Sequence, residues 1–154
     1  MGEAQNACRR KHEEPNMRPV VKFAVVLAGI AVGGPSLAAG GFDGAWNVEV
    51  SCPAYGEAEG FVWRFPARVS GGHLSGKWVS SSDAMNYQVL TGNIGAGGDA
   101  LLTMNGRTGA SNYTIHHDAP HTTSHFTASV HFDATSGSGR RNEHRPCDLR
   151  FSRV

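Results

Sequence analysis

The chain has 154 residues, with 14 basic and 13 acidic side chains and a formal net charge of +1 at neutral pH. This near-balance leaves no electrostatic footprint for nucleic acid or for an anionic membrane surface, so neither class of partner is expected. The length suits a single domain once an N-terminal targeting segment is set aside.

The N-terminal region carries the pattern of an export signal that begins at Met17. Arg18 and Lys22 supply a short basic segment, and the apolar run 23–32 (FAVVLAGIAV) follows it. Small residues predict cleavage after Ala38, and the run is shorter than the roughly 20 residues that span a bilayer, so no stable membrane insertion is expected. The sequence therefore predicts an extension that is untranslated or part of the signal (1–16), a signal peptide (17–38) and a periplasmic or secreted domain (39–154).

Alternation of apolar and polar residues predicts strands along this domain. The alternation is clearest between Phe42 and Cys52, where even-numbered positions are apolar or small. Gly71 and Gly72 predict a two-residue hairpin turn. The predicted strands span residues 42–52, 61–69, 74–78, 86–94, 100–107, 112–116, 126–132 and 147–151.

The segment before the last predicted strand differs in composition from the predicted strands. Residues 135–139 (TSGSG) are predicted to be a flexible turn, and residues 139–145 are polar and can be extended. No window with a helical period and no internal repeat competes with this interpretation, so the domain is expected to be all-β.

Cys52 and Cys147 are the only cysteines of residues 39–154, and in an exported protein they predict a disulfide. Two free thiols in a redox or metal role are the alternative, which no CxxC spacing supports. Cys52 ends the first strand and Cys147 begins the last, and these strands are antiparallel neighbours in an even-stranded barrel. We therefore expect a small antiparallel up-and-down barrel or curled meander of about eight strands, although a sandwich with paired terminal strands also satisfies the cysteines.

Two sequence patterns carry a resemblance to known proteins. The patterns FDGAW (42–46), which leads to the Cys-Pro at 52–53, and RPCDL (145–149) resemble a family of small uncharacterised secreted proteins from proteobacteria. The likeness covers most of residues 39–154, and it implies no activity.

Gly44, Ala45 and Trp46 also resemble the Gly-x-Trp of the first strand in calycins, the group of the lipocalins and avidins. In calycins an arginine from a late strand packs over this tryptophan, so the resemblance implies that Arg150 or Arg153 covers Trp46. The alternative is that Trp46 is simply a core aromatic residue.

Five histidines crowd together late in the chain: His116, His117, His121, His125 and His131. A zinc site needs three or four ligand atoms at about 2 Å from one metal. His125 and His131 share a strand face but lie about 20 Å apart, so they do not share a metal. The loop residues His116, His117 and His121 could in principle converge with His125 on one metal. We favour a solvated face and loop, with no metal and no cofactor.

Other patterns point only weakly to chemistry. No Gly-x-Ser-x-Gly nucleophile elbow is present, and scattered polar residues give no geometry for a catalytic triad. Four carboxylates are candidates for glycoside chemistry but are interpreted as solvated side chains: Asp43, Glu49, Glu57 and Glu59. We expect no enzymatic activity and assign no catalytic residues.

A cationic cluster precedes the second cysteine: Arg140, Arg141, His144 and Arg145. Such a cluster can bind an anionic sugar or a phosphate. We favour the interpretation that it is a sheet edge kept soluble by charge.

An outer-membrane barrel also alternates, with its apolar face turned outward to lipid. The cysteine pair, the polar stretch 80–84 and the lack of an aromatic residue at the C-terminus, Val154, count against it.

Two functions remain. The first is a non-enzymatic binding protein that holds a small apolar ligand against Trp46, Trp63, Phe65 and Trp78. The second is a protein-interaction module, such as a periplasmic enzyme inhibitor, acting through loop 53–60 or loop 116–123. An internal cavity would favour the first function, and a filled core with a rigid protruding loop the second.

Overall fold

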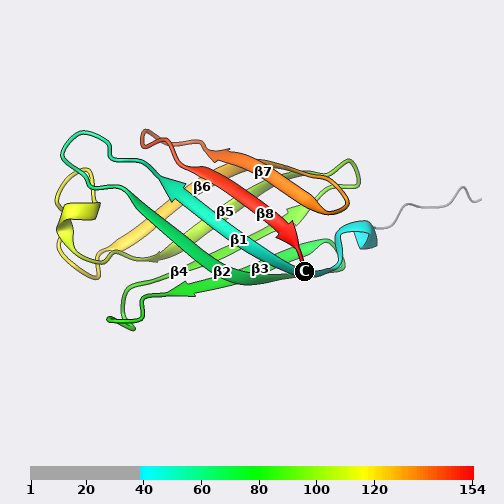
Figure 1. Ribbon diagram of the computed structural model, residues 1–154, viewed down its shortest axis with the longest axis horizontal. Coiled ribbons are helices and arrows are strands. Elements are labelled where there is room, and N and C mark those ends of the chain that lie inside the picture. The colour runs from blue at the N-terminus through cyan, green and yellow to red at the C-terminus, as the bar shows by residue number, and fades with distance from the viewer. Residues whose placement is uncertain (1–38) are drawn as a thin grey trace, which may run out of the picture. The chain divides into compact units, whose positions relative to one another are not determined.

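The computed structural model describes residues 39–154, in which eight strands close into a barrel (Figure 1). Each strand is antiparallel to the preceding one and β8 pairs back with β1, so the strand order around the barrel follows the chain. The elements are η1 (Ala39–Phe42), β1 (Gly44–Cys52), β2 (Phe61–Ser70), β3 (His73–Val79), β4 (Tyr87–Ile94), β5 (Asp99–Arg107), η2 (Ser111–Tyr113), β6 (Thr123–Phe132), β7 (Ser136–Arg141) and β8 (Asp148–Arg153). The all-β barrel expected from the alternation is confirmed. The predicted signal peptide (17–38) and extension (1–16) lie outside the described residues.

The core lies inside the barrel because successive side chains of a strand point to opposite faces. In β1, Trp46, Val48 and Val50 are buried, whereas the residues between them are more exposed. Outward-facing residues include the ion pair of Glu49 and Arg64, whose oxygen and nitrogen lie 2.8 Å apart. Apolar side chains inside and charged ones outside are the reverse of the arrangement in a lipid-facing barrel. Neither 3-10 helix within residues 39–154 has the length and hydropathy of a membrane-crossing helix.

The predicted disulfide is confirmed, and it joins the strands that close the barrel. Six residue pairs connect β1 with β8, from Trp46↔Arg153 to Ser51↔Asp148. Cys52 and Cys147 lie one step beyond the last of these pairs, with their Cα atoms 4.2 Å apart. The bond therefore links the end of β1 to the segment that enters β8.

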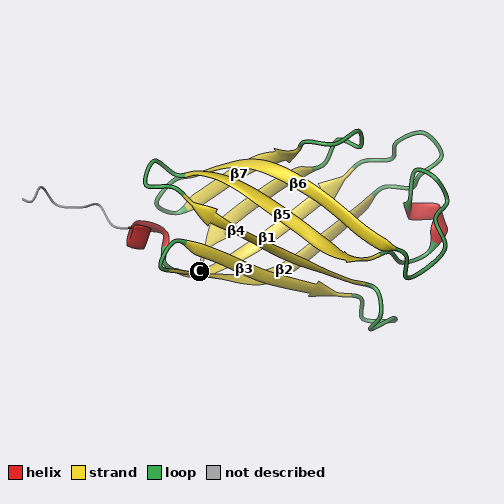
Figure 2. Ribbon diagram, turned by 180° about the vertical axis from the view of Figure 1, so that it is seen from behind, coloured by secondary structure: helices red, strands yellow, loops and turns green. Residues whose placement is uncertain are grey.

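At one end of the barrel, which we call the η1 end, aromatic side chains fill the interior. Trp46 meets Phe132 edge to face with ring centroids 5.5 Å apart, and Phe132 also packs on Phe42 and Phe151. The Trp46 indole donates a hydrogen bond of 2.9 Å to the carbonyl of Phe42. This contact anchors η1 to the barrel. Figure 2 shows η1 as a short helix at this end.

The turn between β2 and β3 is the predicted Gly71–Gly72 hairpin, and an aspartate holds it. Both glycines have positive φ, 58° and 78°, which glycine adopts without strain. The Asp43 carboxylate accepts hydrogen bonds from the N–H groups of Gly71 (2.8 Å) and Gly72 (3.0 Å). These backbone donors hold the pKa of Asp43 below its usual value.

The strand predicted at 112–116 is not formed, and this expectation was wrong. The segment begins in η2, and its N–H groups bond within the segment: Tyr113 donates to the carbonyl of Ala110 and Thr114 to that of Ser111. Such turn bonds use the donors that a strand would offer to a neighbouring strand.

A strand forms instead at β7, where a flexible turn and a polar segment were expected. Gly137 and Gly139 face the interior, where their lack of a side chain lets β7 approach β6 closely. A Cβ atom on Gly137 would lie 2.7 Å from the Phe132 ring, and one on Gly139 would lie 2.6 Å from a Val130 methyl group. These glycines serve packing, not flexibility.

Candidate ligand-binding site

The barrel wall is open between β2 and β3 at the end opposite η1, which we call the loop end. The β2–β3 ladder covers only four residue pairs, from Ser70↔His73 to Ala67↔Gly76. By contrast, β2 pairs with β1 as far as Phe61, and β3 pairs with β4 as far as Val79. In Figure 2 the loop between β3 and β4 projects away from the other loops at this end.

Local sequence explains where this ladder ends. Gly76 permits the close approach of the last pair, since a Cβ there would lie 2.8 Å from that of Ala67. The next residue of β2 is Pro66, which has no N–H to donate, and proline inside a sheet is confined to edges. From this point to the loop end, β2 is an edge strand on the side facing β3.

Aromatic rings line the opening. The Trp63 ring stacks on that of Phe61 with centroids 4.4 Å apart, and on that of Trp78 with centroids 5.0 Å apart. Tyr113 meets Phe61 edge to face at 6.3 Å. We call Phe61, Trp63 and Trp78 the aromatic ladder. All three are only partly buried, so each presents ring surface at the opening.

Two hollows adjoin the aromatic ladder. The first, the loop-end cavity, has a volume of about 290 Å³ and is lined by Phe61, Trp63, Gln88, Phe126, Arg141 and Arg145, among others. The second, the lateral groove, has a volume of about 490 Å³ and is lined by Trp63, Trp78, Asp83, Asn86 and Tyr113, among others. Trp63, Phe61 and Tyr113 line both, so the hollows share one wall.

Polar groups in the cavity wall are largely satisfied by one another. Gln88 is 2% exposed, and its amide donates to Ser124 Oγ (2.9 Å) and to the carbonyl of Arg107 (3.2 Å). Ser124 Oγ in turn donates to Gln88 Oε1 at 3.0 Å. This pair joins β4 to β6 beneath the loops and places a polar patch opposite aromatic rings.

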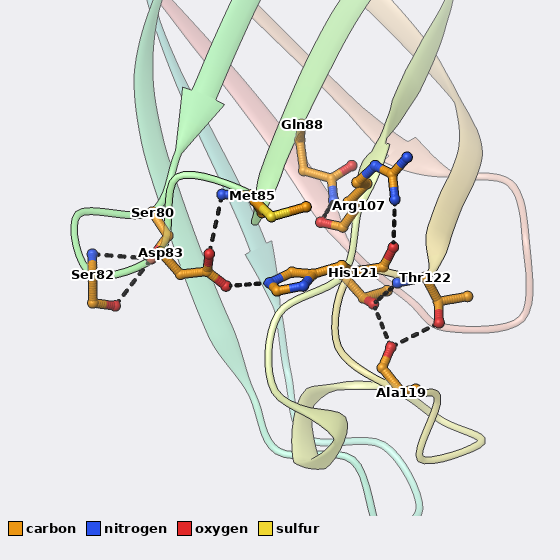
Figure 3. A network of polar contacts seen from close by, with 10 residues as sticks. Ser80, Ser82, Asp83, Met85, Gln88, Arg107, Ala119, His121 and Thr122 are labelled. Atoms are coloured by element: carbon orange, nitrogen blue, oxygen red, sulfur yellow. Dashed lines mark hydrogen bonds and ion pairs between the residues drawn. The ribbon is translucent and has the colours of Figure 1, made fainter.

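Two loops are clasped together beside the lateral groove (Figure 3). The Asp83 carboxylate hydrogen-bonds with His121 Nε2 at 2.7 Å and accepts a bond from the Met85 N–H at 3.0 Å. The bond from His121 holds the pKa of Asp83 below its usual value. The backbone of His121 is fixed as well, because its carbonyl accepts a bond from Arg107 (3.1 Å).

The predicted ligand-binding residues fall into two groups. Trp63 and Trp78 belong to the aromatic ladder at the loop end. Trp46 is fully buried at the η1 end, and Phe65 is 6% exposed in the core, so neither borders the lateral groove or the loop-end cavity. Sequence analysis missed Phe61 and Tyr113, although Pro66 marks β2 as an edge strand and could have pointed to the opening.

Four of the five clustered histidines bond to separate neighbours, and the fifth, His116, lines the loop-end cavity. The hydrogen bonds are His117–Glu57, His121–Asp83, His125–Asn105 and His131–Asp99. Within residues 39–154 no three histidine, cysteine or acidic side chains are grouped so as to hold a metal ion.

Three of the four candidate carboxylates contact different partners in different parts of the barrel. Asp43 binds the hairpin turn at the η1 end, Glu49 pairs with Arg64 on the outer wall, and Glu57 meets His117 in the loops. These three carboxylates therefore do not pair with one another.

The cationic cluster is divided, which corrects its interpretation as an exposed edge. Arg140 is exposed and pairs with Asp148 at 3.0 Å on the outer wall. Arg145 is only 2% exposed, and it lines the loop-end cavity together with Arg141 and His144. The burial of Arg145 could not be inferred from the sequence because the groups that bury it come from distant loops.

Arg153 occupies the position that the calycin resemblance implies. Its guanidinium carbon lies 5.9 Å from the centroid of the Trp46 ring, whereas Arg150 lies on the outer wall. No family model, curated protein or solved structure matches the chain. Membership of either family therefore stays a prediction, and the site must be interpreted from its own geometry.

Proposed function

We propose that this protein is an exported, non-enzymatic binding protein that takes a small apolar ligand in the loop-end cavity. One observation carries the proposal: Phe61 and Trp63 of the aromatic ladder border an unfilled cavity at an opening of the barrel wall. Ligand sites are typically concave, largely apolar and furnished with a few fixed polar groups, and the Gln88–Ser124 pair is such a group.

The two ends of the barrel support this assignment by their contrast. At the η1 end Trp46, Phe132 and Phe151 fill the interior with their own rings. At the loop end the comparable rings, Phe61 and Trp63, stand at the edge of the hollow and keep part of their surface exposed. A ligand that stacks on them would bury this remaining aromatic surface.

The disulfide supports an exported location, because such bonds persist in oxidising compartments such as the periplasm or the extracellular space. The export signal predicted at 17–38 would deliver residues 39–154 there.

The alternative, a protein-interaction module such as a periplasmic enzyme inhibitor, would use loop 53–60 or loop 116–123. Both lie at the loop end, where His117 contacts Glu57 at 3.1 Å and the Glu59 N–H donates to the carbonyl of Asn112 at 2.8 Å. The cavity favours a small ligand over this alternative.

Titration with N-phenyl-1-naphthylamine, a neutral apolar fluorophore, tests the proposal. The wild-type domain should bind it saturably, and Trp63→Ala should weaken binding about tenfold by removing the stacking surface. Leu101→Ala is the matched control, since Leu101 of β5 is 62% exposed and lines neither the loop-end cavity nor the lateral groove. Absence of saturable binding, or equal loss in both variants, would contradict the proposal.

A further inference from the structure

Arg145 is a buried cation that no acidic side chain of residues 39–154 neutralises. It lies in the loop between β7 and β8, and its guanidinium donates to the carbonyls of Tyr113 (2.7 Å), Pro53 (2.9 Å) and Glu59. These acceptors are neutral. Among the described residues no carboxylate comes within ion-pair distance of Arg145, and its buried Nε has no hydrogen-bond partner.

Such an arrangement is costly for the protein alone. A charge taken out of water is usually paired or fully hydrogen-bonded, and a buried donor without an acceptor adds a further cost. Here burial, together with repulsion from Arg141, lowers the pKa of Arg145. Both arginines line the loop-end cavity, so an anion bound there would be attracted by both charges.

The described lining of the cavity next to these arginines contains a single acidic residue. Its lining includes Arg141, Arg145 and three histidines, but Asp118 is its one acidic residue among those described. Glu143 approaches Arg141 with an oxygen 3.4 Å from its Nε, yet this carboxylate also accepts two bonds from Thr127 and is not in the cavity lining. The cavity wall thus has an excess of positive charge.

Aromatic rings lie directly beside the cations. The Arg145 guanidinium carbon is 4.8 Å from the centroid of Phe61, and that of Arg141 is 4.6 Å from the centroid of Phe126. All four residues line the loop-end cavity. The edge of the Arg145 guanidinium is occupied by its bonds to loop carbonyls, whereas among the described residues the Arg141 side chain bonds only through its Nε, to Glu143. An arginine with such a free edge can bind a planar oxyanion.

We infer that the loop-end cavity recognises an amphipathic anion, with a carboxylate or phosphate group toward Arg141 and Arg145 and an apolar body against Phe61 and Trp63. The inference rests on the proposed function and specifies the class of its ligand. Arg145 also holds the loops together, so a purely structural role for it is the competing explanation.

Two related probes separate these explanations. N-phenyl-1-naphthylamine is neutral, and 8-anilinonaphthalene-1-sulfonate has the same aromatic body with an added anionic group. The measured quantity is the ratio of the two affinities. A general disturbance of the cavity weakens the binding of both probes and therefore leaves this ratio unchanged. The wild-type domain should bind the sulfonate more tightly.

Arg141→Gln should reduce the affinity ratio about tenfold, since a charge-assisted hydrogen bond is lost while the neutral probe still binds. Arg141→Lys keeps the charge, so its affinity ratio should lie between those of the wild type and Arg141→Gln. Arg140→Gln is the matched control, because Arg140 is the preceding residue and points outward to Asp148. Arg141 is the principal test position because replacing Arg145 would also release the loops.

The outcomes distinguish the two proposals. If the neutral probe binds in a Trp63-dependent manner and the ratio is the same in wild type and Arg141→Gln, the anion inference is wrong and the binding function stands. If neither probe binds the wild-type domain, both fail. Displacement of the sulfonate probe by decanoate and by decyl phosphate then identifies which oxyanion the site prefers. Decanol, which has no charge, is the reference for both. If decanol displaces the probe as effectively as the two anions, the inference is wrong.

Discussion

The indole rings of Trp63 and Trp78 stack with their centroids 5.0 Å apart, at the part of the barrel wall where β2 and β3 no longer pair. Elsewhere backbone hydrogen bonds join neighbouring strands. Here side-chain stacking replaces them, so aromatic rings form the wall beside the lateral groove. Under the proposed function, a ligand would enter at the loop end and not at the η1 end.

Removing the disulfide should lower stability without opening the barrel. The Cys52–Cys147 bond closes a loop with a sequence separation of 95, for which the chain-entropy model gives on the order of 4 kcal/mol as an upper value. Urea unfolding of the Cys52→Ala/Cys147→Ala double variant should show a markedly lower midpoint, and reduction of the wild-type protein should reproduce it. Equal midpoints in all three samples would show that the bond does not form in the folded protein.

Arg153 should stabilise the η1 end through several contacts at once. Its guanidinium packs over Trp46 and donates to the carbonyls of Gly41 and Ala134, each at 3.0 Å. Arg153→Ala should cost about 1–2 kcal/mol in the free energy of unfolding. Arg150→Ala, on the same strand but facing outward, should cost less than half as much. If the two variants are equally stable, the packing over Trp46 contributes nothing.

Gly139 should not tolerate even a methyl group. A Cβ there would meet a Val130 methyl group at 2.6 Å, so Gly139→Ala should cost about 1–3 kcal/mol through overpacking. Gly97→Ala is the control, because a Cβ at that turn residue would meet nothing within 4 Å. Thermal unfolding of both variants tests this. An unchanged midpoint for Gly139→Ala would mean that β7 does not lie against β6 as described.

Stability should depend on pH through His131. Its Nδ1–H donates a hydrogen bond of 2.8 Å to Asp99 Oδ1, and this bond raises the pKa of His131 above its ordinary value. A raised folded-state pKa stabilises the protein fully below about pH 6.5, and the contribution is lost as the pH rises through the folded-state pKa.

Urea unfolding at pH 6 and pH 8.5 tests this dependence. His131→Gln should remove the part of the pH dependence that His131 supplies. His125→Gln, whose partner is the neutral side chain of Asn105, should leave it in place. A wild-type protein that is as stable at pH 8.5 as at pH 6 would contradict the assignment.

The barrel could be predicted from sequence because its determinants are local. Period-2 alternation located β1, β2 and β6, and the phase of Cys52 and Cys147 indicated that the first and last strands are neighbours. β7 was not predicted because its inward-facing residues are glycines, which give no alternation of apolar and polar side chains. Its position depends on close packing against Phe132, which sequence alone does not reveal.

The site was predicted only in part because its determinants are long-range. Trp63 and Trp78 were chosen as aromatic residues on an inward face, but the same criterion selected Trp46 and Phe65, which the core absorbs. Arg145 looked like an exposed charge until the loops that bury it, which contribute carbonyls 32, 86 and 92 positions away in sequence, were in place.

The most direct test of the binding site uses the three tryptophan side chains as internal reporters. In a ¹⁵N-labelled sample of residues 39–154, each indole N–H gives its own NMR signal, and single Trp→Phe variants assign them. Trp63 and Trp78 lie at the loop end, whereas the Trp46 indole is bonded to Phe42 at the η1 end. Titration with N-phenyl-1-naphthylamine should shift the signals of Trp63 and Trp78 saturably and leave that of Trp46 in place. A titration that moves no signal, or that moves Trp46 as much as the other two, would contradict a ligand site at the loop end.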